Sequence, residues 1–222
     1  MKRGRKKIII SDLPQRPTLE YETGWRARGF ARVAGVDEAG RGPLAGPVHV
    51  AAVVLPEGFE HVLLHDSKQL SENVRERIFD ELMQCEGLSW SLVVLDVLEV
   101  DRMNVLQASR EGMRRAVMAL NPMADAVLVD GLAVPDFPLP QEALVKGDAR
   151  SLSIAAASII AKVSRDRYMR EVSQMYPHYG FEKHKGYGTP EHLAALQKHG
   201  PCPLHRISFA PVAQLTFTFD AA

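Results

Sequence analysis

The chain has 222 residues, of which 46% are hydrophobic, and a chain of this length can bury one good core, so we expect one main domain. No apolar run approaches the roughly 20 residues of a membrane span. The two cysteines, Cys85 and Cys202, are far apart and have no partners at metal-binding spacing, so neither a zinc site nor a disulfide framework is indicated. The 27 basic and 27 acidic residues cancel, and this balance taken alone argues against a nucleic-acid-binding protein.

The charges are unevenly distributed along the chain. Residues 1–32 hold nine Lys or Arg and three Asp or Glu, residues 33–145 hold eight and 18, and residues 146–206 hold ten and five. An acidic centre between basic flanks suits a metal-loaded catalytic site with phosphate-binding walls, because bound cations invert the local charge and Lys and Arg follow a phosphate backbone. Uneven surface charge without a function is the alternative.

The first 32 residues are predicted to form a basic, loosely held N-terminal extension, in which only residues 18–28 have a helical pattern. Its basic residues resemble the front of a signal peptide, but only three isoleucines follow before Ser11. We therefore expect a cytoplasmic protein whose catalytic domain spans residues 33–222. Removing residues 1–30 is expected to weaken nucleic-acid binding and flatten its salt dependence without stopping catalysis.

From residue 33 onward, segments rich in Val and Leu alternate with helical patterns. Strands are expected at residues 33–36, 48–55, 89–97 and 126–129. Helices are expected at residues 71–84, about 103–120, 152–176 and 190–199. The long helix would begin after Ser151, and the last would have Thr189 as its N-cap and Gly200 just past its end. Strands that alternate with helices favour an α/β domain.

Two adjacent acids, Asp37 and Glu38, follow the first apolar strand. A carboxylate there would face the core or project from the strand end, where an unpaired charge is costly and a cation would offset the cost. Gly40 and Gly42 come next, with Arg41 between them, and their small size would let backbone amides approach a phosphate or a sugar closely. A tight hairpin with a surface acid is the alternative interpretation.

Two further acids stand at comparable places. Asp130 ends the apolar strand at residues 126–129, and Asp148 stands just before the long helix, where a plain capping acid is the alternative. Carboxylates on three separate segments can meet only through the fold. Convergent oxygen ligands favour Mg²⁺ or Mn²⁺ over zinc or copper.

Several blocks of sequence together resemble the signature motifs of the ribonuclease HII family. They are VDEAGRG at residues 36–42, Asp-Ser-Lys at 66–68 followed by Leu70, Val-Asp-Gly at 129–131, KGDARS at 146–151 and SIAAASIIAKVSRDR at 153–167. The resemblance covers residues 33 to about 192, and the blocks are highly specific in combination. It implies a ribonuclease H-like α/β fold, with a central mixed β-sheet flanked by helices and a helical C-terminal part.

The resemblance also implies a catalytic site. The metal ligands would be Asp37, Glu38, Asp130 and Asp148, which would share two Mg²⁺ or Mn²⁺ ions about 4 Å apart. Positioning and charge neutralisation supply most of phosphoryl-transfer catalysis, so no catalytic histidine is needed. The five histidines between residues 178 and 205 are expected to be surface or phosphate-facing groups.

Other residues would bind the substrate. The backbone of Gly40, Arg41 and Gly42 is implied to contact the ribose 2′-hydroxyl, the group that distinguishes RNA from DNA. Tyr187 resembles the family's tyrosine beside the scissile junction, and an ordinary half-buried tyrosine between two glycines is the alternative. The candidate phosphate contacts, each as well explained as a solvated surface residue, are Ser67, Lys68, Lys146, Ser151 and Lys185.

The function implied is that of an endoribonuclease. It would hydrolyse the RNA strand of RNA/DNA hybrids and cut 5′ of single ribonucleotides in duplex DNA, leaving 3′-hydroxyl and 5′-phosphate ends. We expect a monomer that binds these nucleic acids and no membrane, with a sliding clamp as a candidate partner. The competing hypotheses are a type HIII ribonuclease H, a non-catalytic nucleic-acid-binding protein, and a recombinase or transposase with the same core. The type HIII enzyme is expected to have a folded N-terminal domain, which the 32 residues before the catalytic domain are too few to form.

Overall fold

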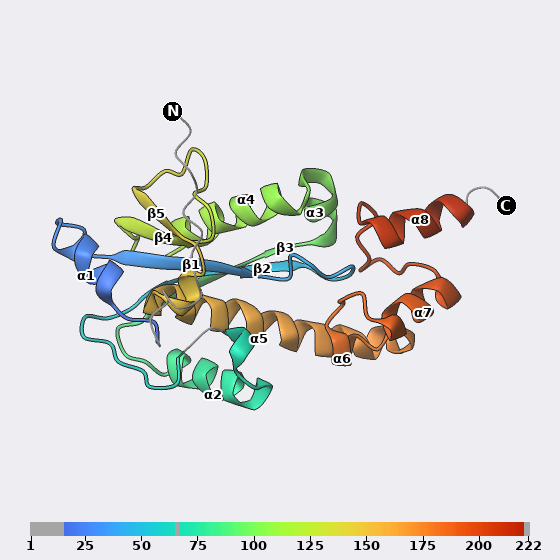
Figure 1. The fold of residues 1–222 in the computed structure, drawn as a ribbon, viewed down its shortest axis with the longest axis horizontal. Coiled ribbons are helices and arrows are strands. Elements are labelled where there is room, and N and C mark those ends of the chain that lie inside the picture. Colours follow the sequence, from blue (N-terminus) through green and yellow to red (C-terminus); the bar gives the residue numbers. More distant parts are fainter. Residues whose placement is uncertain (1–15, 65–66, 220–222) are drawn as a thin grey trace.

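A five-stranded mixed sheet forms the centre of the computed structural model, which describes residues 16–64 and 67–219 (Figure 1). The sheet order is β3-β2-β1-β4-β5, in which β1, β2 and β3 pair antiparallel while β4 pairs parallel with both β1 and β5. The strands are β1 (Val33–Ala39), β2 (Val48–Val54), β3 (Ser89–Leu95), β4 (Ala126–Asp130) and β5 (Gln141–Leu144).

Helices cover both faces of this sheet. On one face lie α3 (Val97–Met103) and α4 (Val105–Met118), and on the other lies α5 (Leu152–Met175) with α2 (Glu72–Met83) packed beside it (Figure 1). The strand β2 contributes alternate residues to the two apolar clusters, so it is buried throughout. Burial on both faces explains why its sequence does not alternate and is apolar at every position except His49. The predicted α/β class and mixed sheet are confirmed.

The long helix α5 packs unusually close to β1. A Cβ atom added at Gly35 of β1 would stand 2.2 Å from the carbonyl carbon of Ser153, so only glycine allows this approach. The adjoining small residues of α5, Ala155, Ala156 and Ala157, are fully buried in the same layer. The close contact brings the beginning of α5 against the strand that carries Asp37 and Glu38.

The N-terminal segment is not loosely attached where the structure describes it. Its helix α1 (Glu20–Arg26) buries Glu22 and Trp25. The indole nitrogen of Trp25 donates to Glu142 at 2.8 Å, and Glu22 accepts hydrogen bonds from the beginning of α5. The loose attachment predicted for residues 16–32 is therefore wrong. Residues 1–15 lie outside the described residues, and the domain boundary at residue 32 stays a prediction.

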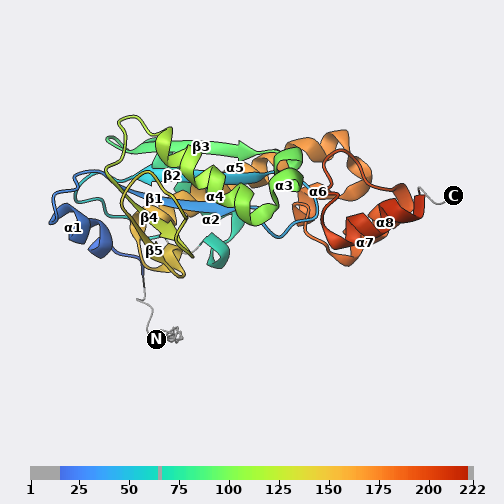
Figure 2. The ribbon, with the colours of Figure 1, turned by 90° about the horizontal axis from the view of Figure 1, so that it is seen from above.

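The helical C-terminal part lies beyond one end of the sheet (Figures 1 and 2). As predicted, Thr189 caps the helix at residues 190–199 by accepting from the His192 amide. Among the described residues, no helix has the length and apolar character to cross a membrane. The elements of this part are the 3-10 turn η4 (Pro177–Tyr179) and the helices α6 (Phe181–His184), α7 (Pro190–His199) and α8 (Ala210–Phe219).

Three of the five C-terminal histidines are buried, so their predicted placement at the surface is wrong. His184, His192 and His205 pack among the aromatic side chains of Tyr179 and Phe181. Their ring nitrogens find partners inside the protein, which removes the cost of burying polar groups. Only His178 and His199 of the five are exposed.

The burial of His205 predicts a loss of stability in mild acid. Burial, and then the neighbouring His192 and His184, lower the pKa of His205 from 6.5 to about 4, although contacts with Cys202 oppose the shift. The unfolded chain therefore binds more protons at this residue between pH 6.5 and about 4, so its contribution is complete above pH 6.5 and is lost as the pH falls through that window.

The measurement compares urea unfolding of the wild type and of His205→Gln from pH 4 to 8. The wild type should lose more stability than the variant between pH 6.5 and 4. The comparison is needed because the raised pKa of the Asp37 carboxyl has the opposite effect on the pH dependence of stability. Parallel pH profiles for the two proteins would contradict the prediction.

Candidate active site

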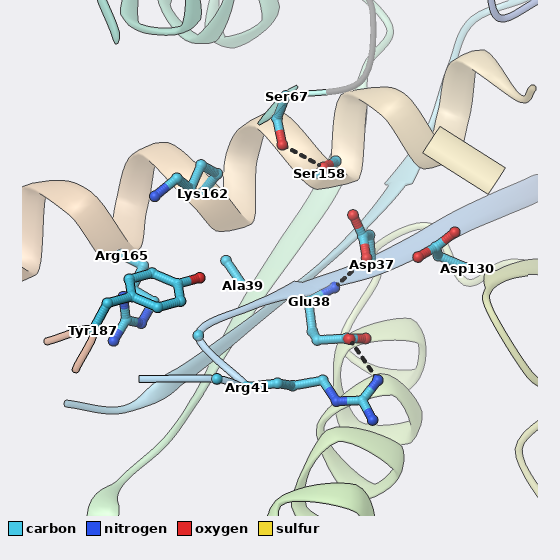
Figure 3. A pocket seen from close by; sticks show the side chains of 12 residues that line it. Asp37, Glu38, Ala39, Arg41, Ser67, Asp130, Ser158, Lys162, Arg165 and Tyr187 are labelled. Carbon is cyan, nitrogen blue, oxygen red and sulfur yellow. Dashed lines mark hydrogen bonds and ion pairs between the residues drawn. The ribbon is translucent and has the colours of Figure 1, made fainter. Parts of the chain in front are cut away.

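Two parallel strands bring two of the predicted acids together. Val36 of β1 pairs with Val129 of β4, so the next residues, Asp37 and Asp130, lie side by side at the same end of the strands (Figure 3). The third acid, Asp148, belongs to the 3-10 turn η3 (Gly147–Ala149) immediately before α5. The amide of Gly147 donates to Asp130 Oδ1 at 2.6 Å, which ties this turn to the end of β4.

The acids border a pocket of about 210 Å³. Asp148 is buried and interacts electrostatically with Asp37, although it does not itself line the pocket. The pocket also includes the glycine loop and the tyrosine that were predicted to bind substrate. The lining residues are Asp37, Glu38, Ala39, Gly40, Arg41, Gly42, Ser67, Asp130, Ser158, Lys162, Arg165 and Tyr187.

The four carboxyl groups conflict electrostatically. Burial raises the pKa of Asp37 well above its usual value, and Asp130, Glu38 and Asp148 raise it further, while a hydrogen bond with Ser158 lowers it. Glu38 turns toward Arg41, whose guanidinium lies 3.1 Å from Glu38 Oε1 (Figure 3). A divalent cation would relieve the repulsion, and an all-oxygen donor set suits Mg²⁺ or Mn²⁺.

The donors gather without forming a closed metal cage. Within residues 16–64 and 67–219, no three His, Cys, Asp or Glu side chains are arranged closely enough to hold a metal ion. The chemistry of the donor set and the charge crowding at Asp37 nevertheless fit a divalent cation.

A buried arginine holds the glycine loop that follows β1. Arg206 is fully buried, and its guanidinium donates to the carbonyl oxygens of Gly40 at 2.6 Å, Arg41 at 3.1 Å and Gly46 at 2.7 Å. Burial lowers the pKa of Arg206 to about 9, so the group stays charged at neutral pH. Charged donors make strong hydrogen bonds, so these contacts hold the loop in place.

A second buried arginine joins the glycine loop to the loop that carries Tyr187. Arg165 of α5 donates to the carbonyl oxygens of Pro47 at 2.9 Å, Ala45 at 3.1 Å and Lys185 at 3.0 Å. Burial lowers the pKa of Arg165 to about 10. The sequence showed no signal for either arginine's loop contacts, because an isolated Arg is normally solvated.

Tyr187 and the glycine loop form one wall of the pocket. The side chain of Tyr187 is 47% exposed, and a Cβ atom added at Gly42 would lie 3.4 Å from its ring. The amide of Leu44 donates to the carbonyl of Gly186 at 2.8 Å. Gly186 has a φ of +86°, and a Cβ there would meet the Ala45 carbonyl oxygen at 2.3 Å, so this position requires glycine.

The predicted phosphate contacts are only partly brought to the pocket. Ser67 lines it and lies 2.9 Å from the Ser158 hydroxyl. Lys68 belongs to the turn η2 (Ser67–Gln69), and its side chain lies outside the described residues. Lys146 is exposed and does not line the pocket, and its phosphate contact stays a prediction.

Two of those contacts are contradicted by the structure. Ser151 is fully buried, where it donates to Glu22 at 2.6 Å and caps α5 by accepting from the Ile154 amide. Lys185 is 8% exposed, and its ammonium group donates to the carbonyl of Glu182. Neither side chain is available to a phosphate in this conformation.

Sequence reasoning missed three pocket residues of α5. Ser158, Lys162 and Arg165 line the pocket from successive turns of the helix (Figure 3). Their spacing of four and then three residues places them on one helical face, which is a signal that the sequence does contain. Lys162 donates to Asp166 at 2.6 Å, and burial lowers its pKa.

Comparison with known proteins identifies the family. The family model for ribonuclease HII matches residues 34–212. A ribonuclease HII of Halalkalibacterium halodurans is 49% identical over 200 residues, which are 90% of this chain and 75% of the relative. A ribonuclease HII of Xylella fastidiosa strain M23 is 54% identical over 187 residues, covering 83% of this chain and 80% of the relative.

Solved structures agree with these relatives. The ribonuclease H2 of Pyrococcus horikoshii OT3 superposes with a TM-score of 0.74 at 28% identity, covering 86% of this chain and all of the other. The ribonuclease HII in a complex with PCNA from Archaeoglobus fulgidus gives a TM-score of 0.68 at 25% identity, covering 80% and 95%. These matches confirm the resemblance found in the sequence motifs. The chain belongs to the ribonuclease HII family, whose members are hydrolases of the ribonuclease H type, that is, endoribonucleases that act on RNA/DNA hybrids.

Proposed function

We propose that this ribonuclease H also cuts 5′ of single ribonucleotides embedded in duplex DNA, leaving 3′-hydroxyl and 5′-phosphate ends. The observation that carries the proposal is the pocket in which the carboxylates meet a glycine loop and an exposed tyrosine. One wall can hold cations for a phosphate, and the other offers small residues and an aromatic face to a sugar. A single ribonucleotide provides one 2′-hydroxyl, which is sufficient for recognition by a loop of this size.

Asp37, Glu38, Asp130 and Asp148 would hold the divalent ions. Divalent metal ions are general to the ribonuclease H family, and two ions, when bound, supply an activated water and stabilise the leaving oxygen. The protein's own contribution is positioning. Ser158 supports Asp37, and the Gly147 amide orients Asp130.

Substrate recognition is assigned to the opposite wall. The Gly40, Arg41 and Gly42 backbone would approach the ribose 2′-hydroxyl, since arginine hydrogen bonds hold this loop in place. Gly40 has a φ of +101°, a conformation that side chains rarely adopt. Contacts with sugars and phosphates would leave the base sequence largely unread.

The test is cleavage of a DNA duplex that bears one embedded ribonucleotide, with Mg²⁺, with Mn²⁺ and with a chelator. We expect a single cut 5′ of the ribonucleotide with either metal, none with chelator, and ends that a DNA ligase and a phosphatase identify as 3′-hydroxyl and 5′-phosphate. Cleavage of continuous hybrids alone, or a 2′,3′-cyclic end, would refute the proposal.

Tyr187 should discriminate between substrates. Tyr187→Phe is expected to keep much of the activity, whereas Tyr187→Ala should lose at least about tenfold in kcat/KM, or about 1.4 kcal/mol of transition-state stabilisation. The loss should be greater for one embedded ribonucleotide, whose 3′ neighbour is deoxyribose, than for a continuous RNA strand, since a 2′-hydroxyl would interfere with ring-on-sugar packing. Measuring kcat/KM on both substrates decides it, and equal losses would mean that Tyr187 only supports its loop.

A sliding clamp is a proposed partner. The support is the similar Archaeoglobus fulgidus ribonuclease HII, whose structure was solved in complex with PCNA. The monomeric state and the cytoplasmic location stay predictions.

A further inference from the structure

The backbone of Tyr187 is held by a pair of buried histidines. His192 Nδ1 lies 2.9 Å from the Tyr187 carbonyl oxygen, and His192 Nε2 lies 3.0 Å from His205 Nε2. His205 Nδ1 in turn lies 3.0 Å from the Cys202 amide nitrogen. These contacts run in one line from the loop at residues 202–205 to the pocket wall.

Hydrogen-bonding rules fix the proton positions along this line. The Tyr187 carbonyl can only accept, so His192 donates from Nδ1 and, being neutral, accepts at Nε2. His205 must then donate from Nε2 and accept at Nδ1, which is where the Cys202 N–H meets it. One neutral tautomer of each ring satisfies these three contacts, and the Cys202 carbonyl oxygen, 3.3 Å from His205 Nδ1, then accepts nothing from the ring.

Burial keeps both rings in those neutral forms. His192 is fully buried and His205 is 2% exposed. The ring of His184 stacks on His192 with 4.5 Å between centroids, and Tyr179 and Phe181 pack around the pair. Burial lowers the pKa of both His192 and His205. A second proton on either ring would set two N–H groups against each other at 3.0 Å.

The loop that carries Tyr187 needs such support. It connects α6 to α7, and Tyr187 stands between Gly186 and Gly188 with its side chain 47% exposed. Glycines on both sides leave the backbone free to adopt many conformations. His192 lies on α7 and is itself fixed by burial, so its hydrogen bond, together with that of the Thr189 amide at 2.8 Å, ties the Tyr187 carbonyl to a rigid element.

We infer that His192, oriented by His205, is a positioning residue that sets Tyr187 against the sugar at the cleavage site. The inference rests on the proposed function of Tyr187. His192 does not itself line the pocket, so it acts only through the tyrosine. A histidine that served only to fill the core would affect stability without any coupling to Tyr187.

A double-mutant cycle tests the coupling. The activity measured is kcat/KM on a duplex with one ribonucleotide, for the wild type, His192→Ala, Tyr187→Ala and the double variant, below the melting temperature of the weakest protein. We expect His192→Ala to lose at least about fivefold, the effect of one hydrogen bond, and to add less than about twofold once Tyr187 is alanine. Losses that multiply, or no loss in His192→Ala, would overturn the inference.

Matched variants separate positioning from packing. Asparagine can present an N–H near the place of histidine Nδ1, so His192→Asn should keep activity close to that of the wild type. His199→Asn, on the exposed side of the same helix, is the control and should change nothing. Activity as low in His192→Asn as in His192→Ala would contradict the role of the Nδ1 donor.

Nuclear magnetic resonance gives a readout that does not depend on cleavage. Long-range ¹H–¹⁵N spectra of the wild type should show the Nδ1–H tautomer for His192 and the Nε2–H tautomer for His205. Backbone order parameters at residues 186–188 should fall in His192→Ala and stay unchanged in His192→Asn. The opposite tautomers, or an unchanged loop in His192→Ala, would overturn the inference even if the proposed function held. Failure of the wild type to cut at a single ribonucleotide would instead refute the proposed function.

Discussion

Asp130→Asn should abolish cleavage while leaving the fold intact. The change removes the charge that a divalent ion requires, and we expect kcat to fall at least about a thousandfold, or about 4 kcal/mol in the barrier. The asparagine oxygen can still accept the hydrogen bond that the Gly147 amide gives to Asp130 Oδ1. Removing one of the charges that raise the pKa of Asp37 also relieves repulsion, so stability should not fall.

The experiment measures single-turnover cleavage, duplex binding and thermal unfolding of Asp130→Asn. Asp136→Asn is the matched control, because Asp136 is exposed, does not line the pocket and has a φ of 52° that asparagine tolerates. Binding and unfolding should match the wild type in both variants. Near wild-type turnover in Asp130→Asn would refute the proposed four-carboxylate site.

The sequence predicted those elements whose pattern follows from burial. The strands β1, β2 and β4 are largely apolar because both their faces are covered, and β4 ends in Asp130 while β1 carries Asp37 and Glu38 just before its last residue. Parallel pairing then brings Asp37 and Asp130 together. The strand β5 was missed because its sequence, QEAL, belongs to a half-exposed sheet edge and lacks the branched residues typical of strands.

Local side-chain contacts set helix boundaries that the pattern did not predict. The helix expected at about residues 103–120 is confirmed as α4, but the short helix α3 before it was not expected, and Asn104, with a φ of 63°, separates the two. Its side chain accepts from the amides of Leu106 and Gln107, so it acts as the cap of α4. The expected strand at residues 89–97 likewise ends early, because Asp96 caps α3. Hydrophobic periodicity does not register such local side-chain contacts.

Ser151 shows why a motif alone did not predict a site residue. The sequence assigned it two roles, as a phosphate contact and as the residue before the long helix, and the structure supports the second. The deciding partner is Glu22, which is 129 residues distant in the sequence and was assigned to a loose extension. The hydrogen bonds of the buried arginines depend on similarly distant partners.

The packing of Glu22 changes what truncation should do. Glu22 Oε1 accepts from the Ser151 hydroxyl at 2.6 Å, the Ser153 amide at 2.9 Å and the Ser153 hydroxyl at 2.6 Å, all fully buried. The neighbouring Thr18 adds backbone hydrogen bonds with Arg150 and Leu152. These contacts hold residues 150–153, which directly follow the turn that carries Asp148, so the segment at residues 18–26 supports the candidate site.

Glu22→Ala should therefore destabilise the protein strongly. Three buried donors lose their acceptor, and we expect a loss of at least about 3 kcal/mol in the free energy of unfolding, which lowers the Tm by roughly 6–12 °C in a domain of this size. Glu20→Ala, on the exposed side of α1, is the matched control and should stay within about 0.5 kcal/mol of the wild type. Equal stability of the two variants in urea unfolding would contradict the role of Glu22.

Two truncations distinguish the structural role of α1 from the electrostatic role of the basic residues that precede it. Removing residues 1–15 deletes five of the basic residues and leaves α1 in place, so it should flatten the salt dependence of duplex binding while kcat at saturating substrate stays close to that of the wild type. Removing residues 1–30 also takes away Glu22 and Trp25, and it should lower both stability and kcat. A kcat that stays close to that of the wild type after the longer truncation would show that the turn at Asp148 holds its position without α1. An unchanged salt slope after the shorter truncation would show that the basic residues do not contact the duplex.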